Sequence, residues 1–187
     1  MKDNILWVEK YRPDMIDDCI LPKSTKDIFQ SIVESGELPN LLLFGTSGVG
    51  KTTVAKALCN QLKCDWLMIN GSDEGRMIDT LRTTISSYAS TVSLSGGKKV
   101  IIIDEADYMT NIAQCALRQI IEKYSKNVRF CIICNYINKI IPAIQSRCMK
   151  FRFSLLTQDE MKSKINHIVE QEKILISDRA ITTIISL

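Results

Sequence analysis

The stretch Gly45-Thr46-Ser47-Gly48-Val49-Gly50-Lys51-Thr52 decides the fold. It matches the phosphate-binding pattern G-x-x-x-x-G-K-[ST], in which glycines let consecutive backbone N–H groups turn toward one anion. The apolar run 41–44 before it is typical of a buried strand, and the stretch 51–62 after it favours a helix. Strand, glycine loop and helix form the context that the pattern needs, so the sequence predicts a phosphate site at a helix N-terminus.

The residues around this loop match the chemistry of a nucleoside triphosphate site. Lys51 can reach the terminal phosphates, and the Thr52 hydroxyl can ligate Mg²⁺. A second apolar run, 100–103, delivers two acids, Asp104 and Glu105, at the end of a predicted strand. Because ligands of such sheets bind at the carboxyl ends of the strands, we expect Asp104 to hold Mg²⁺ and Glu105 to orient the attacking water.

The order of apolar runs predicts the fold class. Strand-like runs alternate for the most part with helical patterns, which indicates an α/β protein with a parallel five-stranded sheet covered on both faces. The predicted strands are 41–44, 66–69, 100–103, 130–134 and 149–153. The helical patterns between them cover 51–62, 78–88 and 112–124.

The chain changes character near residue 155. Thr157 and Glu160 form the sequence pattern of a capping box, and two amphipathic helices follow it. We therefore predict a nucleotide-binding domain over 1–155 and a partial helical domain over 156–187. The apolar stripe Ile181, Ile184 and Ile185 on the second helix is expected to lie uncovered.

Composition is ordinary for a globular protein, with 45% apolar and 24% charged residues among 187. The net charge of +3 is too small to demonstrate nucleic-acid binding. There is no run near the roughly 20 apolar residues of a membrane span and no signal-peptide core, and the seven cysteines are interpreted as reduced thiols in an intracellular protein. Cys131 and Cys134 are three residues apart on a predicted strand and point to opposite faces, which disfavours a zinc site.

Two further positions leave alternatives open. Asn135 ends the fourth predicted strand, where its amide can bind the γ-phosphate or the attacking water, or can simply begin a turn. Arg147 precedes the fifth strand and is either a surface arginine or an arginine finger that completes the site of another subunit.

Six motifs occur in one order and together carry a family resemblance. They are Trp7-Val-Glu-Lys-Tyr-Arg-Pro13, the phosphate loop, Asp104-Glu-Ala-Asp107, Gln114-Cys-Ala-Leu-Arg118, Cys134-Asn-Tyr and Ile144-Gln-Ser-Arg-Cys148. The set resembles the small subunits of sliding-clamp loaders, the replication factor C type of AAA+ ATPase. The segment Asp17-Asp-Cys-Ile-Leu-Pro22 is also similar to the T4-type phage loader. The resemblance runs from Trp7 to the end of the chain.

The resemblance implies a role for each matching residue. The adenine pocket would be lined by Val8, Glu9, Lys10, Tyr11, Arg12 and Ile20. The residues 48–53 would wrap the phosphates of ATP, including Thr53. Asn135 would act as sensor 1, Arg147 would act on ATP bound by the neighbouring subunit, and Gln114 would couple the ATP site to DNA. The candidates for DNA backbone contact are Arg76, Arg82 and Arg118.

The implied function is an ATP- and Mg²⁺-dependent subunit that opens a sliding clamp and loads it on primer–template DNA, with other loader subunits as partners. Such a protein is expected in the nucleus, in the cytoplasm of a prokaryote or in a virus-infected cell, and not at a membrane. Two alternatives stay open: a non-catalytic ATP-binding scaffold subunit, and another AAA+ machine such as a helicase loader or branch-migration motor. The stretch 73–77 is one residue longer than the family leads us to expect. The chain also ends before a third lid helix and a collar, so we expect a truncated lid.

Overall fold

The computed structural model describes residues 6–72, 79, 81–91 and 98–186. Their contacts group them into two compact units, one spanning 13–154 and the other joining the residues before Pro13 to those from Leu155 onward. The proposed division into domains 1–155 and 156–187 stays a prediction. The contacts group the residues before Pro13 with those from Leu155 onward rather than with the sheet.

The larger unit contains the sheet. Its strands are β1 (Leu41–Phe44), β2 (Asp65–Asn70), β3 (Lys99–Asp104), β4 (Val128–Cys134) and β5 (Met149–Arg152). Its helical elements are η1 (Ile16–Asp18), α2 (Lys23–Ser35), α3 (Lys51–Gln61), the π-helical turn η2 (Leu81–Ile85), α5 (Ser86–Ser90), η3 (Ala106–Tyr108), α6 (Asn111–Lys123), η4 (Ile137–Lys139) and α7 (Pro142–Gln145).

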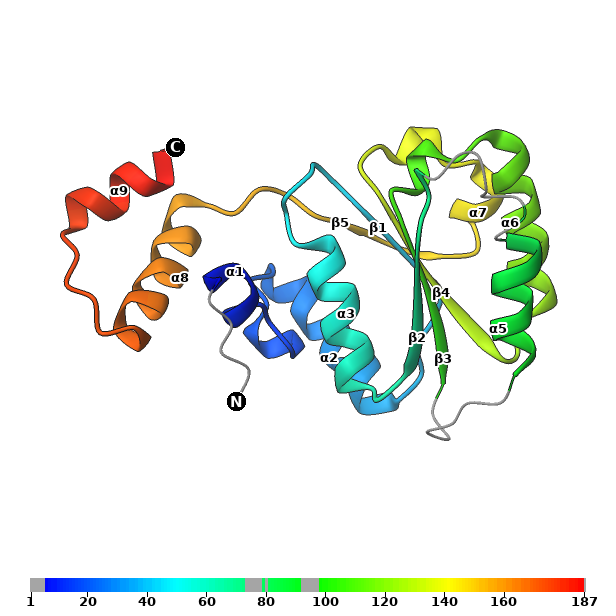
Figure 1. Ribbon diagram of the computed structural model, residues 1–187, viewed down its shortest axis with the longest axis horizontal. Helices are drawn as coiled ribbons and strands as arrows, with labels where there is room; N and C mark the ends of the chain where they lie inside the picture. Colours follow the sequence, from blue (N-terminus) through cyan, green and yellow to red (C-terminus); the bar gives the residue numbers. More distant parts are fainter. Residues whose placement is uncertain (1–5, 73–78, 80, 92–97, 187) are drawn as a thin grey trace. The chain divides into compact units, whose positions relative to one another are not determined.

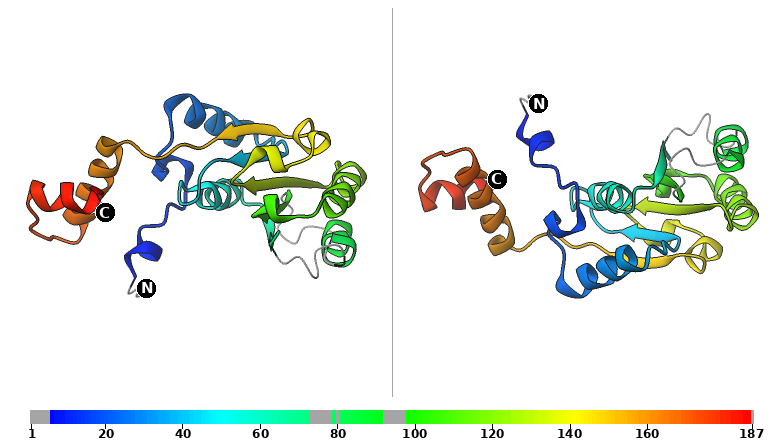
Figure 2. Two further views of the ribbon diagram at one scale, coloured as in Figure 1. Left: turned by 90° about the horizontal axis from the view of Figure 1, so that it is seen from above. Right: turned by 90° about the horizontal axis from the view of Figure 1, so that it is seen from below.

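The five strands are all parallel and follow the order β2-β3-β4-β1-β5, which confirms the predicted fold class (Figure 1). Strand β1 lies between β4 and β5, as the views from above and below show (Figure 2). The order places the carboxyl end of β1 next to that of β4, with β3 one strand further. The residues that follow these three strands therefore meet at one edge of the sheet.

Each face of the sheet is covered by its own helices. Helices α2 and α3 pack on one face, and α5, α6 and α7 pack on the other (Figure 1). Side chains alternate along a strand, so Cys131 belongs to the core on the α3 side and Cys134 to the core on the α6 side. This confirms that the two thiols point to opposite faces and cannot converge on one metal ion.

The smaller unit holds α1 (Trp7–Lys10), α8 (Gln158–Gln171) and α9 (Asp178–Ser186). The capping box is confirmed, since the Thr157 hydroxyl accepts from the Glu160 backbone N–H while the Glu160 carboxylate accepts from that of Thr157. The expectation of an uncovered stripe on α9 is wrong for Ile181, which is only 3% exposed, whereas Ile184 is half exposed. No helix among the described residues is long and apolar enough to span a bilayer.

The predicted helix 78–88 differs from the structure in its first described turn. Residue 79 is helical, η2 makes a π-helical turn, and α5 continues as an α-helix to Ser90. The stretch 73–77 and Arg76 lie outside the described residues, and so does the side chain of Arg82.

Candidate functional site

The loop between β1 and α3 takes its shape from glycines. Gly48 and Gly50 have φ angles of 79° and 86°, a left-handed conformation that residues with a Cβ atom rarely adopt. Gly45 has φ 149°, and a Cβ there would lie 2.1 Å from the carbonyl oxygen of Phe153. The chain thus passes directly against the end of β5 before it turns into α3, whose first residue is Lys51.

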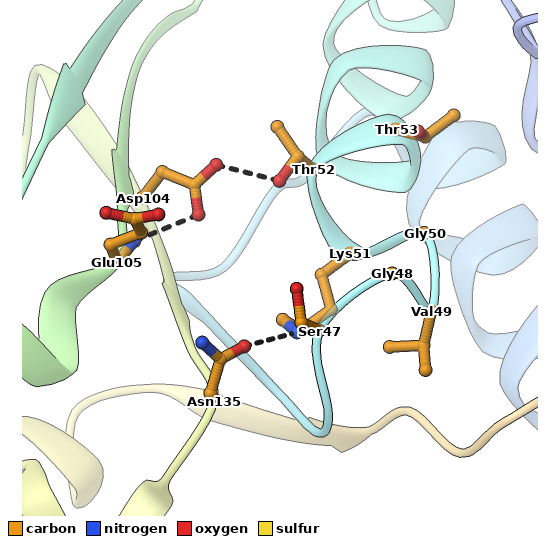
Figure 3. Close-up of a pocket in the computed structure, with 10 residues that line it drawn as sticks. All are labelled: Ser47, Gly48, Val49, Gly50, Lys51, Thr52, Thr53, Asp104, Glu105 and Asn135. Carbon is orange, nitrogen blue, oxygen red and sulfur yellow. Dashed lines mark hydrogen bonds between the residues drawn. The ribbon is translucent and has the colours of Figure 1, made fainter. Parts of the chain in front are cut away.

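A pocket lies over this loop at the carboxyl edge of the sheet. It is lined by Ser47, Gly48, Val49, Gly50, Lys51, Thr52, Thr53, Asp104, Glu105 and Asn135 (Figure 3). Three segments that are far apart in sequence therefore converge: the glycine loop, the end of β3 and the end of β4. The structure brings together the residues for which the sequence predicted catalysis and phosphate contact, except for Arg147. Gly45 and Thr46 lie just before the lining residues and supply carbonyl groups to Lys51.

Lys51 is held from both sides of the pocket. Its ammonium donates to the carbonyl oxygens of Gly45 and Thr46, both at 2.7 Å, and to Oδ1 of Asn135 at 3.0 Å. The side chain is 7% exposed, and this burial lowers the pKa of Lys51, while the negative charge of Asp104 opposes the shift. A desolvated ammonium at the junction of a glycine loop and a helix N-terminus is suited to bind a phosphate oxygen.

Thr52 and Asp104 present two oxygen atoms at the same point. The Thr52 hydroxyl donates to Asp104 Oδ2 at 2.8 Å, and in Figure 3 the two side chains point toward each other across the pocket. Hydroxyl and carboxylate oxygens are the ligands that Mg²⁺ takes at nucleotide sites, alongside phosphate oxygens. The pair therefore fits a magnesium ion held between the protein and a bound nucleotide.

Glu105 lines the pocket beside Asp104 and sits at a turn. Its φ of 53° is left-handed, and its backbone N–H donates to Asp104 Oδ1 at 2.9 Å. That bond fixes the carboxylate of Asp104 with one oxygen toward the backbone and the other toward Thr52. The arrangement leaves Glu105 as a second carboxylate on the pocket wall, where it can accept a proton from a water.

Asn135 is anchored at two places. Its side-chain oxygen accepts from Lys51, and its backbone N–H donates to Oδ1 of Asp107 at 3.1 Å. Asp107 belongs to the acidic motif, but the sequence assigns it no role. A carboxylate two residues beyond Glu105 was the available signal, although nothing in the sequence showed that it would face β4.

Arg147 is not among the described residues that line this pocket. Its guanidinium donates to Glu122 on α6 at 2.6 Å and to the carbonyl oxygen of Ala143 at 2.6 Å. The same Glu122 carboxylate lies 3.8 Å from Nε of Arg118, four residues earlier on the helix. The sequence did not single out Glu122, although its i,i+4 spacing from Arg118 predicts an ion pair on one face of the helix.

Gln114 is buried in α6, with an exposed fraction of 1%. Its amide nitrogen donates to the carbonyl oxygens of Met109 and Lys139, and its amide oxygen accepts from the backbone N–H of Ile141. The side chain thus joins the segment before α6 to the segment around η4. It does not line the pocket, so the coupling role implied by the resemblance stays a prediction.

The predicted adenine-binding residues divide between the two units. Val8, Glu9, Lys10, Tyr11 and Arg12 belong to the smaller unit, and Ile20 belongs to the larger one. Within the smaller unit, Lys10 and Tyr11 both donate to the Glu172 carboxylate, at 2.6 Å and 2.8 Å. These contacts lower the pKa of Glu172, with the bond from Lys10 as the largest cause. Arg12 pairs with Glu9 at 2.9 Å.

Comparison with solved structures shows the same fold elsewhere. A structure of the Thermotoga maritima RuvB Holliday junction branch migration motor superposes with a TM-score of 0.75 at 22% identity, over 94% of this chain and 59% of that one. A variant of the same protein gives a TM-score of 0.78 at 20% identity, with 94% and 59% coverage. At this level of identity the likeness concerns the fold alone.

Comparison of amino-acid sequences finds relatives of higher identity. Human replication factor C subunit 5 is 45% identical over 98% of this chain and 56% of its own length. Replication factor C subunit 3 of Saccharomyces cerevisiae is 42% identical over 100% of this chain and 56% of its own. The chain spans about half the length of these relatives. The model of the ATPase family associated with various cellular activities (AAA) matches residues 41–156, the stretch that holds the pocket. The chain therefore belongs to the AAA family of ATPases.

Proposed function

We propose that this chain is the nucleotide-binding part of an ATP-hydrolysing subunit of a DNA sliding-clamp loader. The observation that carries the proposal is the convergence of Lys51, Thr52, Asp104, Glu105 and Asn135 on one pocket, in a chain that is 45% identical to a replication factor C subunit. A scaffold subunit that only binds nucleotide would have no need of Glu105. The presence of Glu105 beside Asp104 therefore supports a subunit that hydrolyses ATP rather than one that only binds it.

In the proposed reaction, each group acts on a different part of ATP. The loop N–H groups and Lys51 bind the β- and γ-phosphates, and Thr52 and Asp104 hold Mg²⁺, which neutralises phosphate charge when bound. Glu105 accepts a proton from the attacking water as the new oxygen–phosphorus bond forms and the bond to the ADP oxygen breaks. Asn135 donates from its amide to the γ-phosphate or to the water.

The site of one chain is incomplete in this proposal. The Arg147 guanidinium is bound to Glu122 and Ala143 of its own chain and does not line the pocket of that chain. In a loader it would reach the γ-phosphate of ATP held by the adjacent subunit, where a planar cation offsets charge in the transition state. We therefore expect the isolated chain to bind MgATP and to hydrolyse it slowly.

The partners follow from the same assignment. Other loader subunits would flank the chain, and a sliding clamp and primer–template DNA would be its substrates. The protein would act where the cell replicates its DNA. Of the basic residues proposed to contact the DNA backbone, Arg118 has a partly exposed side chain on α6 near Glu122. Contacts of arginine to phosphate carry no sequence information, which suits action at any primer end. Gln114 would transmit DNA contact to the ATP site through the segments it joins.

Three measurements test the proposal. First, Lys51→Ala should abolish nucleotide binding by the isolated chain, and Glu105→Gln should preserve it. Second, ATPase of the full-length protein, assembled with its loader subunits, should be stimulated by clamp with primed DNA and not by Holliday-junction DNA. Third, Arg147→Ala should remove that stimulation while leaving nucleotide affinity unchanged. Rapid turnover by a demonstrated monomer, insensitive to Arg147→Ala, would contradict the role in trans.

A further inference from the structure

One buried carboxylate lies directly behind the pocket and has no part in the reaction proposed above. Asp107 in η3 is 6% exposed. Its Oδ1 accepts a hydrogen bond from the backbone N–H of Asn135 at 3.1 Å. Its Oδ2 is buried and accepts no hydrogen bond from any described residue. A buried carboxylate with a single bond is costly, so its position calls for a reason beyond packing.

The turn after β3 explains how Asp107 reaches this place. Glu105 adopts a left-handed conformation with φ 53°, and the chain then enters the short helix η3. Glu105 consequently lines the pocket, while Asp107 turns into the protein interior. Strands β3 and β4 are direct neighbours, so a residue just beyond the end of β3 can meet the first residue beyond the end of β4.

The bond to Asp107 forms one side of a two-point anchor on Asn135. The backbone of Asn135 is tied to a carboxylate, and its side-chain oxygen is tied to the Lys51 ammonium at 3.0 Å. With both ends held, the amide nitrogen of Asn135 has a defined position on the pocket wall. The charge of Asp107 also raises the pKa of Lys51, after the larger effects of burial, Asp104 and Cys134, so Asp107 and Lys51 interact electrostatically as well.

We propose that Asp107 is a positioning residue that fixes Asn135 through its backbone N–H, so that the Asn135 amide meets the γ-phosphate. The inference rests on the proposed ATP site and adds the means by which the chain distinguishes ATP from ADP. Asp107 does not touch the nucleotide. Its effect on the preference between the two nucleotides passes through Asn135, and this sets it apart from a residue that merely stabilises the fold.

The test measures discrimination between nucleotides rather than turnover. Isothermal titration calorimetry gives the Kd of the whole chain for MgADP and for the Mg²⁺ complex of a non-hydrolysable ATP analogue. The variants are Asp107→Ala, Asp107→Asn, Asn135→Ala and the double alanine variant. Asp107→Asn keeps an oxygen that can accept from the backbone, and Asp107→Glu, measured in parallel, keeps the charge but displaces the oxygen by one methylene. The glutamate variant tests the geometry even if the alanine variant does not fold.

A matched control comes from the far end of α3. The Gln61 side-chain oxygen accepts from the backbone N–H of Ile16 at 3.0 Å, a bond of the same kind that lies away from the pocket. Gln61→Ala should lower stability and leave the ratio of the two Kd values unchanged.

We expect Asp107→Ala to reduce the preference for the ATP analogue about tenfold, Asp107→Glu to reduce it as well, and Asp107→Asn to retain most of it. The double variant should be no worse than Asn135→Ala. Any of three results would overturn the inference. The ratio of the two Kd values could stay at its wild-type value in Asp107→Ala or Asp107→Glu, or the preference for the ATP analogue could fall equally in the alanine and asparagine variants. The third such result would be a double variant whose loss of preference is the sum of the two single losses. An unchanged ratio in Asn135→Ala would overturn the inference as well, even if Lys51→Ala abolishes binding and the proposed function stands. Failure of the wild type to bind either nucleotide would overturn both.

Discussion

Replacement of Gln114 by methionine tests a buried side chain of the larger unit that holds three backbone groups. Methionine has nearly the same length and can fill the space, but it offers no strong donor or acceptor. Three backbone groups lose their partner: the carbonyls of Met109 and Lys139, and the N–H of Ile141. The consequence should appear as lost stability of this unit.

The magnitude follows from where the three bonds lie. A hydrogen bond contributes about 1 kcal/mol net, and a buried group left without a partner costs about 1–3 kcal/mol. The bond to Met109 is buried, whereas those to Lys139 and Ile141 are partly buried, so water can replace part of what they lose. We expect Gln114→Met to lower the free energy of unfolding by about 2–4 kcal/mol.

Urea denaturation followed by tryptophan fluorescence measures this change. Trp66 lies on β2 in the unit that contains Gln114, while Trp7 lies in the other, so a Trp7→Phe background restricts the signal to the relevant unit. The control is Gln119→Met, the same substitution at an exposed position of the same helix, which should change stability by less than about 0.5 kcal/mol. A loss below about 1 kcal/mol for Gln114→Met would refute the view that its amide joins the two segments.

Three further outcomes are expected. Gly45→Ala should prevent the native approach of the loop to β5, because its Cβ would lie 2.1 Å from the Phe153 carbonyl oxygen, and calorimetry should show lost nucleotide binding with a lowered Tm. Cys115, the exposed thiol, should react first with a thiol reagent at pH 8, and Cys115→Ser should remove that fast phase. NMR titration should give a pKa for Glu172 below the usual glutamate value, and that pKa should rise in Lys10→Met. Because the pKa is depressed in the folded state, the contact stabilises the smaller unit at pH values above the ordinary glutamate pKa. This stabilisation is lost as the pH falls through the pKa of the folded state.

Most of the fold follows from patterns that act locally. Strand-like patterns identify all five strands to within two residues. The central strands β1, β3 and β4 read as nearly continuous apolar runs because both of their faces are covered, whereas the edge strand β5 alternates exposed polar residues with a buried Phe151. The glycine pattern identifies the loop, because left-handed φ angles and the close approach at Gly45 leave little choice of residue. The capping box identifies the start of α8 for a similar reason, since its two bonds join residues three apart.

What the sequence did not reveal depends on contacts between distant segments. Glu122 meets Arg147 across 25 residues, and Glu172 meets Lys10 across 162. Neither separation along the sequence matches the repeat of a helix or a strand, so only the packing of the chain brings these groups together. The burial of Ile181 is of the same kind, because an amphipathic stripe shows which face is apolar but not what covers it.

The acidic motif shows why residue type alone could not assign the site. Asp104, Glu105 and Asp107 are three carboxylates within four residues, yet they meet three different environments. Asp104 faces Thr52, Glu105 faces the open pocket, and Asp107 is buried against the backbone of Asn135. The left-handed backbone at Glu105 produces this division, because it turns the chain between the first and the fourth position of the motif. A residue that tolerates this conformation poorly, such as a β-branched one, would therefore disturb the positions of the Asp104 and Asp107 carboxylates together.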